Sequence, residues 1–162
     1  MLSIDYVLIV VLLISIYTDL RFQKIYNVVI FPAVLFALGY HLAIGGAYGI
    51  LFSLKGAGIG LLLFLIPYLL GGLGAGDVKL LAVVGAYKGI GFVLYSALIT
   101  AIIGGIIALA ILLYRRELLK TISSLLTGMR ICHLPTLADE GKVSFPYGVA
   151  IALGSMTSYV VM

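Results

Sequence analysis

The chain has 162 residues, of which 64% are hydrophobic and only 10% are charged, and its mean hydropathy is +1.28. This composition excludes an ordinary soluble domain and predicts an integral membrane protein. The formal net charge of +4 would suggest nucleic acid as the partner of a soluble domain, but Lys and Arg gathered in loops on one side of a membrane account for it. We therefore expect a lipid bilayer, and no nucleic acid, as a partner.

Apolar stretches that could cross a bilayer as helices recur about six times along the chain. We expect spans at about residues 4–18, 25–44, 49–70, 78–87, 90–113 and 145–161, which make one all-α, polytopic, membrane-embedded domain of residues 1–162. The fourth stretch is short for a crossing. Either residues 72–76 dip into the membrane ahead of it, or it continues into the fifth stretch through Lys88 and Gly89.

The Lys and Arg residues predict how these spans are oriented, because cytoplasmic loops carry a positive excess. Positive charge follows the first span, lies near the start of the fourth and fills the segment before the last, in Arg21, Lys24, Lys79, Arg115, Arg116, Lys120, Arg130 and Lys142. With six crossings, these residues are expected on the cytoplasmic side of the cell membrane and both termini outside. Lys55 and Lys88 then lie toward the outer side, where a long side chain can snorkel to the headgroups.

The segment of about 114–144 is expected to be a cytoplasmic loop that carries an amphipathic helix at the membrane surface. Apolar residues recur there at helical spacing, at Leu118, Leu119, Ile122, Leu125, Leu126 and Met129. Cys132 is the single cysteine, so the chain has no internal disulfide and no Cys-x-x-Cys zinc module. We expect neither a cofactor nor a metal ion.

Asp19 and Asp77 fall where predicted spans meet the cytoplasmic surface. A carboxylate at such a place needs a partner, water or a chemical role. Two carboxylates close together can share a proton, so that one takes a proton from an attacking water and the other protonates the departing group. We expect this pair to hydrolyse a peptide bond. The other four acidic residues are expected to be solvated surface charges: Asp5, Glu117, Asp139 and Glu140.

Glycines precede Asp77 at positions 71, 72, 74 and 76. Four glycines in six positions make a poor helix, so we expect an irregular backbone there. Such an edge, with Gly74 and Gly76 in it, can pair with an extended substrate segment as an added strand. Gly56 and Gly60 instead form a small-xxx-small pair, which favours close packing of helices.

Both carboxylates also have structural explanations. Asp19 could be a helix-end residue paired with Arg21, Lys24 or Lys79, and Asp77 could cap the N-terminus of the fourth span. Two other functions stay open as well: a small proton-coupled transporter that uses both carboxylates as a relay, and a non-catalytic subunit of a pilus or secretion machine.

In several of these segments the chain resembles the type IV prepilin peptidase family, membrane aspartic proteases with a Gly-x-Gly-Asp motif. The matching segments are Asp-Leu-Arg at 19–21, Ile-Tyr-Asn at 25–27, Gly-Ala-Gly-Asp-Val-Lys-Leu-Leu at 74–81, and Phe-Pro-Tyr-Gly-Val-Ala-Ile-Ala-Leu-Gly at 145–154. The resemblance implies that Asp19 and Asp77 are catalytic, and that a pilin-like or preflagellin-like precursor is cut at the cytoplasmic face, just before its hydrophobic helix. Asn27 and Lys79 join the two motif glycines as expected substrate-binding residues, although Lys79 could instead snorkel or tune the ionisation of the pair.

Two departures from the family pattern bear on the activity. Tyr26 stands where an Ile-Pro-Asn element has Pro, which leaves the role of Asn27 open. Only two residues separate Phe22 from Ile25, whereas larger bacterial members carry there an insertion with paired cysteines and also methylate the new N-terminus. The chain resembles instead the short archaeal and Tad-type peptidases, so we expect no methyltransferase activity. The sequence leaves open the individual precursor and the oligomeric state.

Overall fold

The structure is a computed structural model that describes residues 3–114 and 147–161, and the regular elements in these residues are all α-helices. They are α1 (Ser3–Phe22), α2 (Asn27–Leu69), α3 (Ala75–Tyr114) and α5 (Tyr147–Val161). The predicted all-α class is confirmed for this part of the chain. The predicted amphipathic helix of the cytoplasmic loop lies outside the described residues, as do Cys132, Glu117, Asp139 and Glu140.

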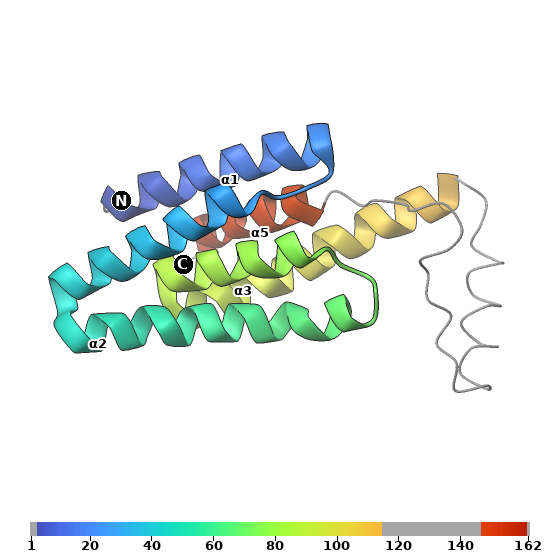
Figure 1. Cartoon of the computed structure of the whole chain (residues 1–162). Coiled ribbons are helices and arrows are strands. Elements are labelled where there is room, and N and C mark those ends of the chain that lie inside the picture. Colours follow the sequence, from blue (N-terminus) through green and yellow to red (C-terminus); the bar gives the residue numbers. More distant parts are fainter. Residues whose placement is uncertain (1–2, 115–146, 162) are drawn as a thin grey trace.

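α2 and α3 each consist of two helical arms that meet at a glycine. Gly46 has φ 56° and ψ −137°, and Gly89 has φ 80° and ψ −174°, conformations that residues with a Cβ rarely adopt. The chain folds back on itself at both glycines, so each helix forms a hairpin of two arms (Figure 1). The fourth predicted span therefore runs directly into the fifth through Lys88 and Gly89, which is the second of the two predicted paths.

Within residues 3–114 and 147–161, two helices are long and apolar enough to cross a membrane: α2, and α3 over Ala75–Ile107. Large apolar side chains lie open on both; Tyr48 and Val28 of α2 are 86% and 82% exposed, and Leu98 of α3 is 64% exposed. Such surfaces are unusual on a soluble monomer but are solvated well by lipid. Six separate crossings and the side of each terminus stay predictions. The arms of α2 and α3 do end within a few residues of the limits predicted for four of the spans.

The second arm of α2 packs against the first arm of α3 through glycines. A Cβ on Gly56 would collide with the carbonyl group of Gly85, a Cβ on Gly85 would collide with that of Gly56, and a Cβ on Gly60 would lie 2.6 Å from the carbonyl oxygen of Leu81. Backbones approach this closely only where small residues line the contact. The predicted packing role of Gly56 and Gly60 is confirmed, and the contact fixes the position of α3 and of Asp77 within it.

The bundle has two distinct ends. The C-terminal end of α1, the connection 70–74 between α2 and α3, and the first turn of α5 lie at one end, whereas the two glycine kinks and both chain termini lie at the other (Figure 1). Asp19, near the end of α1, and Asp77, near the start of α3, therefore share one end of the bundle. The predicted topology requires this arrangement.

Asp5 forms a cluster at the opposite end. The prediction that it is a solvated surface charge is wrong, because only 4% of the residue is exposed. Its Oδ1 accepts hydrogen bonds from Lys88 Nζ at 3.0 Å and from the Tyr159 hydroxyl at 3.2 Å. Lys88 therefore forms a salt bridge inside the bundle rather than snorkelling to headgroups. We call these residues the Asp5–Lys88–Tyr159 cluster; it joins α1, α3 and α5.

Candidate active site

Asp19 lies in the last turn of α1, and only 6% of it is exposed. The backbone N–H of Gly148, in the first turn of α5, donates a hydrogen bond of 2.8 Å to Asp19 Oδ2. The first N–H groups of a helix have no partner within the helix and carry partial positive charge, so they stabilise a carboxylate beside them. The N-terminus of α5 thus holds the Asp19 side chain from 129 positions further along the chain.

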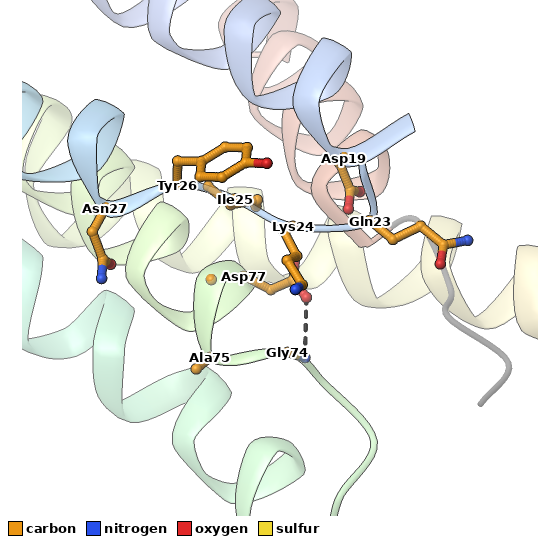
Figure 2. Close-up of a pocket in the computed structure, with 10 residues that line it drawn as sticks. Asp19, Gln23, Lys24, Ile25, Tyr26, Asn27, Gly74, Ala75 and Asp77 are labelled. Carbon is orange, nitrogen blue, oxygen red and sulfur yellow. Dashed lines mark hydrogen bonds between the residues drawn. The ribbon is translucent and has the colours of Figure 1, made fainter. Parts of the chain in front are cut away.

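Asp77 lies in the first turn of α3, and only 7% of it is exposed. Its Oδ2 accepts a hydrogen bond of 3.1 Å from the Gly74 N–H (Figure 2), and its own N–H donates to the Gly74 carbonyl oxygen at 3.1 Å. The bond from Gly74 matches one half of a capping box, in which the side chain of the third helical residue accepts a hydrogen bond from the N–H of the N-cap residue. Asp77 therefore supports the start of α3, as the capping alternative suggests, but from inside the first turn rather than from the N-cap.

Asp19 and Asp77 line one cavity of about 310 Å³. Its other walls come from the connection between α1 and α2 and from the start of α3, with lining residues Gln23, Lys24, Ile25, Tyr26, Asn27, Gly74, Ala75 and Gly76 (Figure 2). The fold thus brings the two carboxylates of the sequence hypothesis to a common space, although they lie on different helices.

No described cation forms a salt bridge with either carboxylate. Arg21 donates to a tyrosine hydroxyl of its own helix at 2.6 Å, and Lys79 Nζ donates to Asn27 Oδ1 at 3.0 Å. Among the described residues, Asp19 therefore forms no salt bridge with Arg21, Lys24 or Lys79, contrary to the structural alternative. Two buried carboxylates without a cation between them repel each other when both are ionised.

The two motif glycines allow close approach around Asp77. A Cβ on Gly76 would lie 2.9 Å from the Cβ of Ile25 and 3.4 Å from its backbone N and O, and a Cβ on Gly74 would lie 3.0 Å from Asp77 Oδ2. Ordinary contact between carbon atoms is about 3.5–4.0 Å. Gly76 therefore lets the start of α3 press against the connection that follows Asp19, a packing role that the motif alone did not indicate. The predicted irregular backbone is confirmed over residues 70–74, whereas Gly76 is helical.

The four expected substrate-binding residues occupy different places around the cavity. Gly74, Gly76 and Asn27 line it, whereas Lys79 does not line it and instead binds Asn27. The Gly74 N–H is already used by Asp77. Pairing of a substrate strand with this edge stays a prediction.

Gln23 was not singled out in the sequence, yet it shapes the cavity. It has φ 51°, the only positive φ among the described non-glycine residues, and its N–H donates to the Asp19 carbonyl oxygen at 2.9 Å. A left-handed residue at this place ends a helix, and glycine usually occupies it. The turn directs residues 24–26 over the start of α3, which forms one wall of the cavity.

Two residues of α5 also belong to the site. Besides Gly148, which binds Asp19, Tyr147 lies within electrostatic range of the Asp77 carboxylate. The segment 145–154 contributes to the resemblance described above, but neither residue stood out as a site residue, because glycine and tyrosine are both common in spans and at their ends. The first turn of α5 thus binds Asp19 and lies within electrostatic range of Asp77.

Comparison with known proteins adds one match. A family model described as the type IV leader peptidase family matches residues 6–109 of the chain. The matched region contains most of α1, all of α2 and most of α3, with both Asp19 and Asp77, and it stops before α5. No curated protein and no solved structure matches the chain.

Proposed function

The chain belongs to the type IV leader peptidase family, and we propose that it is an aspartic endopeptidase that removes the leader from type IV prepilin-like or preflagellin-like precursors. Asp19 and Asp77 form its catalytic pair, in a single membrane-embedded domain of residues 1–162. One observation carries the proposal: two carboxylates from different helices, each more than nine-tenths buried, line the same cavity.

The pair works by sharing one proton. Two carboxylates close together do not readily ionise at the same time, so one is ionised and the other protonated. The ionised group takes a proton from water as the water oxygen attacks the scissile carbonyl carbon. The protonated group gives its proton to the amide nitrogen as the C–N bond breaks. The pair holds one proton before and after the turnover, so no other acid or base is required.

Backbone amides orient both carboxylates before substrate arrives. Gly148 binds Asp19 and Gly74 binds Asp77, each through Oδ2. Because these donors belong to helix starts, they reorganise little during the reaction, which favours charge stabilisation. The amides thus serve as fixed supports for the pair.

Asn27 lines the cavity, and its side chain is suited to hold the extended leader segment. Lys79 has only donors, so the Asn27 atom it binds is the carbonyl oxygen, and the Asn27 NH₂ group is left to donate to a substrate carbonyl. The hydrophobic helix of the precursor stays in lipid beside the exposed apolar faces of α2 and α3. In this arrangement the cavity lies at the cytoplasmic face and both termini lie outside.

The test is precursor cleavage by Asp19→Asn and Asp77→Asn. Asn keeps an oxygen that can accept the Gly148 or Gly74 amide, so both variants should fold, but an amide cannot carry the proton that the reaction requires. We expect cleavage to be lost in both and retained by Glu117→Gln, which removes an acidic group that the sequence predicts to be a solvated surface charge. Cleavage is measured by N-terminal sequencing after purified protein and precursor are mixed in detergent.

The same assay separates the proposal from its alternatives. Mass spectrometry of the mature N-terminus should show an unmethylated residue. Substantial cleavage by a folded Asp19→Asn or Asp77→Asn protein would rule out the pair. Failure of the unsubstituted protein to cut any leader-bearing precursor would favour a transporter or an assembly subunit.

A further inference from the structure

The first turn of α5 lies outside the region that matches the family, yet it contacts Asp19 of the proposed catalytic pair. Gly148 is bound to Asp19, and the preceding Tyr147 lies within electrostatic range of Asp77. α5 therefore binds one carboxylate of the pair directly and lies within electrostatic range of the other.

Space at Gly148 is limited by the Asp19 side chain. A Cβ at position 148 would lie 2.7 Å from Asp19 Oδ2, 3.0 Å from its Cγ and 3.1 Å from its Cβ. These separations are well below the ordinary contact distance of about 3.5–4.0 Å. Any side chain at 148 must push the carboxylate aside or move the start of α5.

Gly148 affects the Asp19 carboxylate in two ways: its N–H donates a hydrogen bond to it, and its lack of a side chain leaves room for it. The 2.8 Å hydrogen bond fixes one Asp19 oxygen, and the close approach that makes this bond possible requires a residue without a Cβ. The backbone amides of Gly148 and Val149, both in the first turn of α5, act on the Asp19 carboxylate.

We propose that Gly148 is a positioning residue for the proposed peptidase: its amide holds Asp19 in line with Asp77, and its lack of a side chain makes that contact possible. This inference rests on the proposed function. Since an error of about 1 Å in a reacting group can cost on the order of a hundredfold in rate, a Cβ at 148 should affect the chemical step far more than substrate binding.

The first test compares Gly148→Ala with Gly154→Ala. Gly154 lies on the same helix and is at least as crowded, because its Cβ would collide with Thr100 and lie 3.0 Å from the Ser96 carbonyl oxygen, but it does not contact Asp19. We expect Gly148→Ala to lower kcat about a hundredfold with KM within about threefold, and Gly154→Ala to keep kcat within about threefold at a similar loss of thermal stability. Equal losses of kcat in the two variants, or near-normal kcat in Gly148→Ala, would overturn the proposal.

The second test measures the contact without any activity. Asp19→Ala removes the Oδ2 and Cγ atoms that a Cβ at 148 would meet, so Gly148→Ala should lower the Tm by several degrees in the unsubstituted protein and by less than half as much in the Asp19→Ala background. Equal Tm losses in both backgrounds would refute the contact. If Gly148→Ala fails to fold alone, its folding in the Asp19→Ala background supports the contact, and failure to fold there refutes it.

The two tests separate this inference from the proposed function. If the Tm losses show coupling between positions 19 and 148 but Gly148→Ala cleaves precursor normally, the contact exists without a role in positioning. If the unsubstituted protein cleaves no precursor, the proposed peptidase is refuted, and if Asp19→Asn cleaves it, the catalytic pair is refuted, whatever the Tm values show.

Discussion

Substitution of Asp5 should destabilise the protein strongly, although Asp5 lies at the end of the bundle opposite the proposed catalytic pair. The Asp5 side chain is 5% exposed and that of Lys88 is 24% exposed. Asp5→Asn leaves the Lys88 ammonium without its carboxylate, and removing one partner of a buried pair costs about 3–5 kcal/mol.

Two features of the cluster reduce this cost. The Lys88 ammonium is partly accessible, and it keeps its contacts with the Tyr159 and Phe92 rings, at 4.6 Å and 5.3 Å from their centres. We therefore expect a loss of about 2–3 kcal/mol for Asp5→Asn, or roughly 5–10 °C in Tm for a chain of this length. Lys88→Met should cost more, because it removes the cation that faces the less exposed Asp5 carboxylate.

Thermal unfolding in detergent measures these losses, with Lys55→Met as a control that removes an exposed lysine of α2. The double variant Asp5→Asn/Lys88→Met removes both charges together. Its loss of stability should therefore be smaller than the sum of the losses in the two single variants. The reasoning fails if both single variants unfold within about 1 °C of the unsubstituted protein, or if the double variant shows simple additivity.

Three other predictions follow from the site and the topology. Gly76→Ala should lower kcat/KM on the order of a hundredfold, because its Cβ would lie 2.9 Å from that of Ile25 and must displace the start of α3 by roughly 1 Å. Gly58→Ala is the control, since a Cβ at position 58 meets nothing within 4 Å. Equal activities of the two variants would contradict the packing role of Gly76. In a Cys132→Ser background, a cysteine at Gly72 should react with impermeant thiol reagents only from the cytoplasm and one at Ala47 only from outside, and labelling from the same side would exclude the topology. Cleavage should survive chelators, since a carboxylate pair that shares a proton activates water without a metal ion; activity lost to chelation and restored by zinc would refute this mechanism.

Local sequence signals predicted the elements of this protein and its pair of carboxylates. The length and apolarity of the stretches predicted the helices, and glycines lay at the predicted breaks between them. The kinks at Gly46 and Gly89 fall between predicted spans. Small residues at a spacing of four predicted the packing of Gly56 and Gly60. Asp19 and Asp77 were found because a carboxylate is rare in so apolar a chain and because both adjoin the same predicted surface.

The partners of these residues depended on the tertiary structure alone. Asp5 binds Lys88 from 83 positions away, Asp19 binds Gly148 from 129 positions away, and Gly76 meets the backbone of Ile25. The physical reason lies in the helices themselves: a helix that is apolar on every side has no polar face to show which side points inward. Its rotation and depth are set by the close contact of glycines and by a few buried polar groups, and these determine their partners only when the helices have packed.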